Sequence, residues 1–222
     1  AIMKSSLKDS ILRKFITPDS NGNTLMTPIV ISREKKVLYF HIAKTGGSSI
    51  AQLLRNNKMD DMVLGNKRGI HEEKVAYFEE VLEEWEEYYK FTFVRNKFDL
   101  LISLYNYDRQ LNGKYSLPNH VTFEEFITNH VGVQDPIYTH WIDQYYLTYA
   151  DGECMYDFVG RFENYNEDLN TVCKHLGIEN TQIRTNIGNY DRSKKQEYYT
   201  EDLKQIVKDR FSDEIECFNW WY

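Results

Sequence analysis

The chain has 222 residues, of which 41% are hydrophobic and 15% aromatic, and its formal net charge is −7. This hydrophobic content can form a core and excludes wholesale disorder, while the acidic balance argues against nonspecific nucleic-acid binding, which needs basic residues to neutralise phosphates. The longest apolar runs are far shorter than the roughly 20 residues that cross a bilayer, and three widely spaced cysteines match neither a disulfide framework nor a zinc site. We therefore expect a soluble protein with no membrane segment and no metal, in which any anionic ligand meets a local cluster of positive charge.

The first part of the chain is polar and interrupted by turn-forming residues. We expect an N-terminal arm or capping segment over 1–35, followed by one domain over 36–222. The run 35–42 is short, apolar and followed by glycines, which predicts a strand buried on both faces. The composition of 49–55 then predicts a helix.

A glutamate-rich helix is predicted over 72–89. Its apolar residues recur at steps of three and four and form a single stripe, made by Val75, Phe78, Leu82, Trp85 and Tyr89. The eight glutamates of the segment then lie mainly on the other face. This pattern is typical of a solvated surface helix, and a partner-binding or metal-binding acidic helix is the alternative.

The remaining pattern alternates strands with helices. Strands are predicted over 91–94 and 156–160, and helices over 96–110, 122–130, 137–147, 163–176 and 200–211. This order indicates an α/β domain with a small parallel sheet.

A glycine turn lies between the first predicted strand and the helix after it. Two glycines allow the backbone N–H groups to converge, and the helix N-terminus adds partial positive charge. The turn also contains the ammonium group of Lys44 and several hydroxyl groups that can donate hydrogen bonds to an anion. Its candidate ligands for a phosphate or sulfate are Lys44, Thr45, Gly46, Gly47, Ser48 and Ser49. It is not a Walker A loop, because the lysine precedes the glycines.

A second candidate site follows the strand predicted over 91–94. Arg95 comes directly after it, and Ser103 lies about two helical turns further on. An arginine fork suits bidentate phosphate binding, and a hydroxyl can complete the set. Because the carboxyl ends of parallel strands line one crevice, we expect Arg95 and Lys44 to project into one site.

These two segments carry a resemblance to a known family. The stretch His-Ile-x-Lys-Thr-Gly-Gly-Ser-Ser resembles the 5′-phosphosulfate loop of sulfotransferases that use 3′-phosphoadenosine 5′-phosphosulfate (PAPS), in particular the branch of Golgi glycan (heparan- and chondroitin-type) sulfotransferases and their bacterial relatives. The segment after it is similar to the 3′-phosphate motif of that family, with Arg95 and Ser103 at the phosphate-binding positions. Ala43 and Lys97 stand where prolines are common and Leu100 where arginine is common, and we expect these departures to loosen the loops.

The resemblance implies a P-loop-like three-layer fold with a small central parallel sheet flanked by helices. It also implies PAPS as co-substrate, no metal, and a catalytic histidine between the two motifs, where His71 lies. His140, beside Trp141, is the rival base or a lining residue of the acceptor pocket, whereas His41 is expected to be structural. Arg192 and Ser193 fall in a late basic loop that resembles the one closing over the nucleotide.

We therefore expect sulfuryl transfer from PAPS to a hydroxyl acceptor, either a carbohydrate or a small alcohol. A catalytically inactive nucleotide-binding or scaffold protein and a divergent P-loop kinase are the alternatives. The net charge of −7 disfavours a densely sulfated acceptor, and the aromatic residues over 111–150 are candidates for either acceptor site or core. We expect a cytoplasmic location for a bacterial protein, with a Golgi luminal domain separated from its anchor as the alternative.

Overall fold

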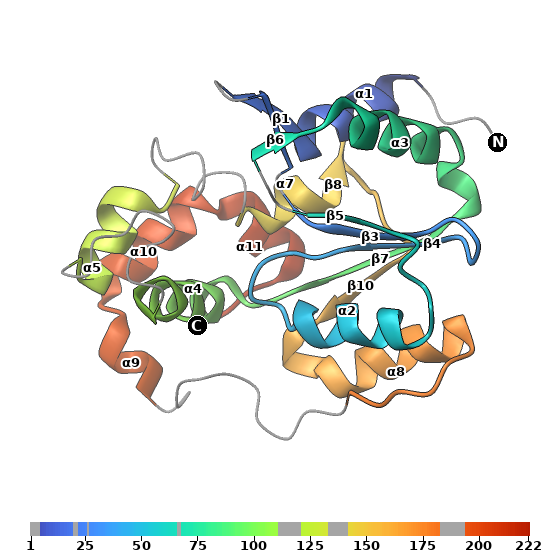
Figure 1. Cartoon of the computed structure of the whole chain (residues 1–222). Helices are drawn as coiled ribbons and strands as arrows, with labels where there is room; N and C mark the ends of the chain where they lie inside the picture. Colours follow the sequence, from blue (N-terminus) through green and yellow to red (C-terminus); the bar gives the residue numbers. More distant parts are fainter. Residues whose placement is uncertain are drawn as a thin grey trace.

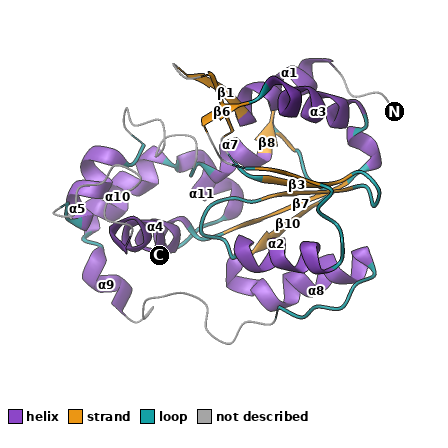
Figure 2. Ribbon diagram, in the orientation of Figure 1, coloured by secondary structure: helices purple, strands orange, loops and turns teal. Residues whose placement is uncertain are grey.

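The structure is a computed structural model. It describes residues 5–19, 22–25, 27–65, 68–110, 121–132, 142–182 and 194–222. Figure 1 shows a sheet between two groups of helices, with a third group beyond one end of the strands, and Figure 2 separates the helices from the strands.

The central sheet has five strands in the order β10-β7-β4-β3-β5. Their bounds are Ile29–Ser32 for β3, Val37–Phe40 for β4, Met62–Leu64 for β5, Tyr89–Val94 for β7 and Phe158–Arg161 for β10. The strands β4, β7 and β10 run parallel, while β3 is antiparallel to both of its neighbours. The three predicted strands are confirmed.

The strand β3 was not predicted, although every residue in it is buried. The central sheet therefore includes residues before position 36, where we expected the domain to begin. The N-terminal segment also holds a helix, α1 (Ser5–Phe15), and two strands, β1 (Ile16–Asp19) and β2 (Gly22–Leu25). These two strands form a small antiparallel sheet with β6 (Arg68–Ile70).

Helices cover both faces of the central sheet (Figure 1). On one face lie α2 (Gly47–Asn56) and α8 (Tyr165–Leu176), and on the other lie α1 and α3 (Glu72–Glu83). Successive side chains of β4 point to opposite faces of the sheet. Leu38 packs in the core on the α1 and α3 side, and Tyr39 packs in the core on the α2 and α8 side. This is the expected three-layer arrangement, with a mostly parallel sheet.

A further core lies beyond the carboxyl ends of the strands. It is built around α4 (Lys97–Gln110), α10 (Glu201–Arg210) and the short α5 (Phe123–Glu125), which continues as a π-helical turn over Phe126–His130. The last helix, α11 (Ser212–Phe218), packs against both α10 and α7 (Gln144–Thr148). The minor elements are β8 (Tyr149–Ala150), β9 (Glu153–Cys154), α9 (Lys195–Tyr198) and the 3-10 turns Trp85–Glu87 and Phe162–Asn164.

The glutamate-rich helix is shorter than predicted. It ends at Glu83, and Tyr89 belongs to β7, because its N–H donates to the Lys36 carbonyl at 2.8 Å and so joins the sheet. The carboxylate of Glu84, just after the helix, accepts hydrogen bonds from Lys36 and Arg33, each at 2.9 Å. These two cations lower the pKa of Glu84 to about 2.

Candidate anion-binding site

The loop between β4 and α2 depends on its two glycines. Gly46 is the N-cap of α2 and has a φ of 85°, in the left-handed region that glycine adopts most readily. A Cβ on Gly46 would lie 2.5 Å from the ring of Tyr165, whose hydroxyl donates to the Gly46 carbonyl at 3.0 Å. A Cβ on Gly47 would lie 2.0 Å from the ring of His41. Both glycines therefore allow the loop to pack closely against aromatic rings.

The N-terminus of α2 suits an anion. Its N-cap, Gly46, makes no side-chain cap hydrogen bond, and its first turn holds no acidic residue. Ser48 is exposed here and Ser49 is half-buried. Thr45 differs from them, because its hydroxyl is buried and donates to the Ile42 carbonyl at 2.7 Å. Thr45 thus braces the loop with its side chain, and only its backbone N–H remains as its contribution to an anion site.

Arg95 reaches this loop from the end of the neighbouring parallel strand. It is 2% exposed, and its Nη1 donates to the carbonyl of Lys44 at 3.1 Å. The guanidinium lies over the ring of Phe162, at 4.1 Å from the ring centre. The two basic motifs, 51 residues apart in the chain, therefore meet in space.

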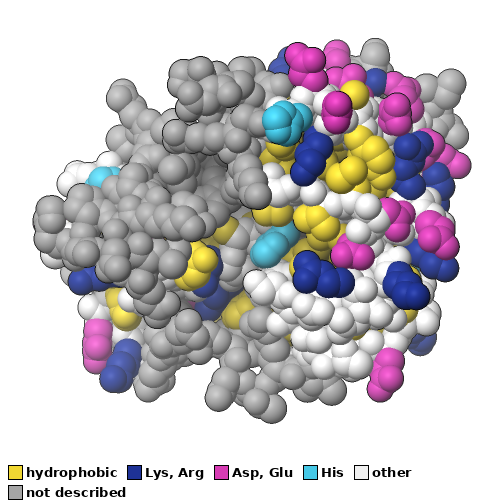
Figure 3. All heavy atoms as spheres, in the orientation of Figure 1, with side chains coloured by type: hydrophobic (Ala, Val, Ile, Leu, Met, Phe, Trp, Pro, Cys, Tyr) yellow, Lys and Arg dark blue, Asp and Glu magenta, His cyan; other side chains and the backbone are white. Residues whose placement is uncertain are grey.

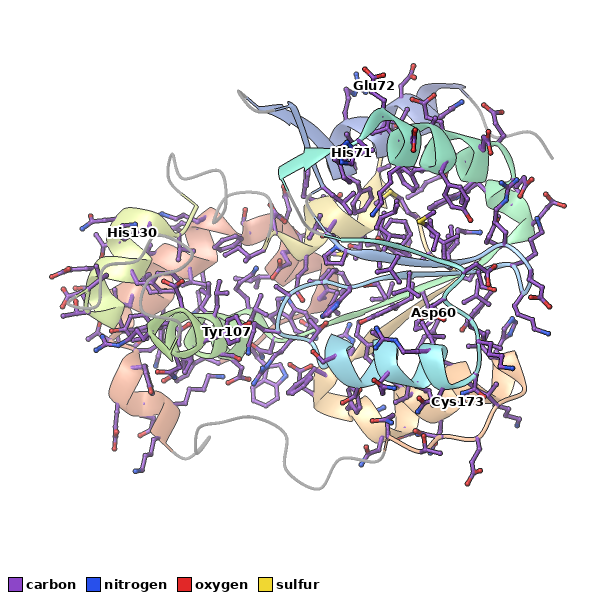
Figure 4. All side chains as sticks on the ribbon, viewed as in Figure 1. Asp60, His71, Glu72, Tyr107, His130 and Cys173 are labelled. Carbon is purple, nitrogen blue, oxygen red and sulfur yellow. The ribbon has the colours of Figure 1, made fainter. Side chains whose placement is uncertain are left out.

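The helix α4 contributes a face to the same site. The ammonium of Lys44 lies 4.1 Å from the centre of the Tyr107 ring, which Figure 4 shows on α4. Ser103 precedes Tyr107 by one helical turn, so both lie on the face of α4 that turns toward the loop. Sequence reasoning missed Tyr107, although its spacing of four residues from Ser103 was the available signal.

The late basic loop is described only in part. Arg192 and Ser193 lie outside the described residues, as does His140. Lys195, just after the loop, forms an ion pair of 3.2 Å with Asp99 in the first turn of α4. The chain therefore leaves this loop next to the helix that carries Ser103.

The described histidines differ in their position relative to the loop. His71 is exposed and is the N-cap of α3, and Figure 4 shows it apart from Tyr107. Of the histidines in the described ranges, His41 is the one against the loop: its ring stacks on Tyr39 at 5.9 Å and abuts Gly47. Burial lowers the pKa of His41, which favours its neutral form.

The segment that follows β10 stabilises the fold beside the site. Arg161 donates to the Phe218 carbonyl at 2.8 Å and lies over the ring of Trp220, so its role is structural. Glu163 accepts from the backbone N–H of Asn96. The Glu163 contact fixes the chain immediately after Arg95.

The acidic side chains gather elsewhere. Figure 3 shows a concentration of Asp and Glu over α3, on the opposite side of the sheet from α2. Within the described ranges, no group of three or more His, Cys, Asp or Glu side chains could hold a metal ion. No helix in the same part of the chain is both long and apolar enough to cross a membrane.

The fold and the site define a class: an α/β protein whose strand–glycine loop–helix unit and neighbouring arginine form one cationic site at the carboxyl edge of a sheet. Comparison with protein families then identifies it, because the sulfotransferase family model matches residues 27–221. The chain belongs to the sulfotransferase family, whose general activity is sulfuryl transfer. Neither a search of curated proteins nor a search of solved structures returns a match.

Proposed function

We propose that this protein transfers the sulfuryl group of PAPS to a hydroxyl of a carbohydrate or small alcohol. The observation that carries the proposal is the contact between Arg95 and the Lys44 carbonyl, at 3.1 Å. It joins a glycine loop and an arginine from adjacent parallel strands into one site for a ligand with two anionic groups.

The two halves of the site suit the two ends of the nucleotide. The N–H groups at the start of α2, with Lys44 and Ser48, would hold the 5′-phosphosulfate. Arg95 and Ser103 would hold the 3′-phosphate, whose charge and geometry match the arginine fork. Arg192 and Ser193 would then close over the nucleotide, since Lys195 tethers the end of their segment to α4.

The reaction proposed is an in-line displacement at sulfur. A bond forms between the acceptor oxygen and sulfur as the bond from sulfur to the bridging phosphate oxygen breaks. Lys44 and the loop N–H groups would stabilise the charge that develops on the bridging oxygen. His71 would take the proton of the acceptor hydroxyl, and its exposure at the start of α3 makes it accessible to an acceptor arriving from solvent.

The distribution of charged residues restricts the chemical class of acceptor that could bind. His71 is the N-cap of α3, the helix over which Asp and Glu side chains gather (Figure 3). A densely sulfated polymer would be repelled there. We propose a neutral or weakly charged hydroxyl compound instead.

A transfer screen tests this function. The wild-type protein, Lys44→Met and His71→Ala would be incubated with radiolabelled PAPS and a panel of glycans, lipid alcohols and small phenols. We expect a labelled product with the wild-type protein, and loss of transfer with retained nucleotide binding in His71→Ala. Full turnover in His71→Ala would remove this residue as the base, and nucleotide binding without transfer to any acceptor would favour the inactive scaffold.

A further inference from the structure

The side chain of Gln144 holds the backbone of Arg95 at two points. Its Oε1 accepts from the Arg95 N–H at 2.7 Å, and its Nε2 donates to the Arg95 carbonyl at 2.7 Å. Gln144 is the first residue of α7 and is 0% exposed. Beyond the end of β7, this amide therefore satisfies the backbone groups that another strand would otherwise pair.

A buried ion pair holds Gln144 in turn. The carboxylate of Glu214 in α11 accepts from the Gln144 backbone N–H at 2.6 Å and from its Nε2 at 3.3 Å. It also accepts from the Trp220 indole at 3.0 Å and pairs with the Lys97 ammonium at 3.0 Å. Lys97 and Glu214 are 0% and 1% exposed.

These contacts close a ring through three separate segments. Lys97 lies two residues after Arg95, so the ring runs from the Arg95 backbone through Gln144 and Glu214 to Lys97 and back along the chain. Every member is buried, so its hydrogen bonds are shielded from competing water. The ring fixes the position from which the Arg95 side chain extends to the Lys44 loop.

We propose that Gln144 is a positioning residue, held by the Lys97–Glu214 pair, that sets Arg95 for the 3′-phosphate of the nucleotide. This inference rests on the proposed function, in which Arg95 binds that phosphate. An arginine held in place before binding loses less conformational freedom when the ligand arrives, so its contribution to affinity is larger. Without the Gln144 amide, Arg95 keeps its positive charge, but its backbone is no longer held in position.

The test measures the affinity contribution of the 3′-phosphate alone. Isothermal titration of the full chain with adenosine 3′,5′-bisphosphate and with AMP gives the ratio of their dissociation constants. In Gln144→Leu we expect this ratio to fall by on the order of tenfold, with AMP affinity changed less than about twofold. A general loss of structure would instead weaken both nucleotides and lower the melting temperature in parallel.

Thr148→Val is the matched control. Thr148 lies one turn further along α7, is 0% exposed, and donates to the Gln144 carbonyl at 2.5 Å, so its replacement also removes a buried hydrogen bond. It does not involve the Gln144 side-chain amide, and we expect the ratio to be unchanged in this variant. If Gln144→Leu does not fold, Gln144→Asn, which keeps an amide but is one methylene shorter, is expected to show the same loss.

The possible results distinguish a failure of the positioning role of Gln144 from a failure of the proposed function. A wild-type protein that binds both nucleotides equally would overturn the assignment of Arg95 to the 3′-phosphate, and the proposed function with it. If the wild-type protein prefers the bisphosphate and the Gln144 variant keeps the same preference, the positioning role of Gln144 is wrong, while the proposed function is unaffected. A loss of the preference in Gln144→Leu but not in Thr148→Val supports the proposal.

Discussion

Replacing Gly46 by alanine tests the packing that shapes the anion-binding loop. At a φ of 85° an alanine costs about 1–2 kcal/mol more than glycine. Its Cβ would also lie 2.5 Å from the ring of Tyr165, which is 1% exposed and packs between Phe93 and Phe162. Because that ring has little room to move, overpacking adds about 1–3 kcal/mol. We expect a total destabilisation of about 2–5 kcal/mol.

Gly177→Ala separates the two contributions. Gly177 has a φ of 70°, but a Cβ there would meet nothing within 4 Å, so only the backbone cost applies. Urea unfolding monitored by circular dichroism should show a larger loss for Gly46→Ala, and titration should show weaker nucleotide binding for that variant alone. Equal losses of stability in the two variants, with nucleotide affinity unchanged, would refute the close packing of the loop against Tyr165.

Three further predictions concern the groups around this loop. Burial lowers the pKa of His41, so the folded state binds fewer protons than the unfolded state between that pKa and about 6.5. The His41 contribution to stability should therefore be complete above this pH window and fall as the pH drops through it, by up to about 1.4 kcal/mol per pH unit. Unfolding of His41→Phe, followed from pH 8 to 5, should lack this slope. Lys97→Met should lose about 3–5 kcal/mol in urea unfolding because it leaves Glu214 buried without its cation. Lys97→Met/Glu214→Gln, which removes the unpaired charge but keeps a side-chain oxygen for the Gln144 N–H, should recover part of that loss, and equal stability of the two variants would contradict the ion pair. Arg95→Lys keeps the charge but loses the planar fork, so the preference for adenosine 3′,5′-bisphosphate over AMP should fall by about tenfold in titrations, and an unchanged preference would remove Arg95 as the 3′-phosphate ligand.

The local patterns of the sequence predict much of the fold. A continuous apolar run marks β4 because this strand is buried on two faces, and periodic apolar residues mark most of the long helices. The meeting of Lys44 and Arg95 was also predictable, because parallel strands end at the same edge of a sheet.

Contacts between distant segments could not be predicted in this way. Gln144 lies 49 residues after Arg95 and has no motif of its own, so nothing in its neighbourhood indicates the role of its amide. Lys97 was expected to loosen its loop because it replaces a common proline, but the structure shows the opposite: it is fully buried and paired with Glu214. The strand β3 was missed because its four residues follow a polar segment and are too few to show a period.

A nucleotide titration without magnesium tests whether this protein selects a nucleotide with a 3′-phosphate. Adenosine 3′,5′-bisphosphate and ADP would be compared by isothermal titration calorimetry on the wild-type protein, then again with magnesium added. We predict that the 3′,5′-bisphosphate binds at least about tenfold more tightly than ADP and that magnesium leaves this difference unchanged, because in the proposed binding mode Arg95 meets the 3′-phosphate and Lys44 the 5′-phosphate. Equal affinity for the two nucleotides, or ADP binding that becomes the tighter of the two once magnesium is added, would show that the site does not select a 3′-phosphate.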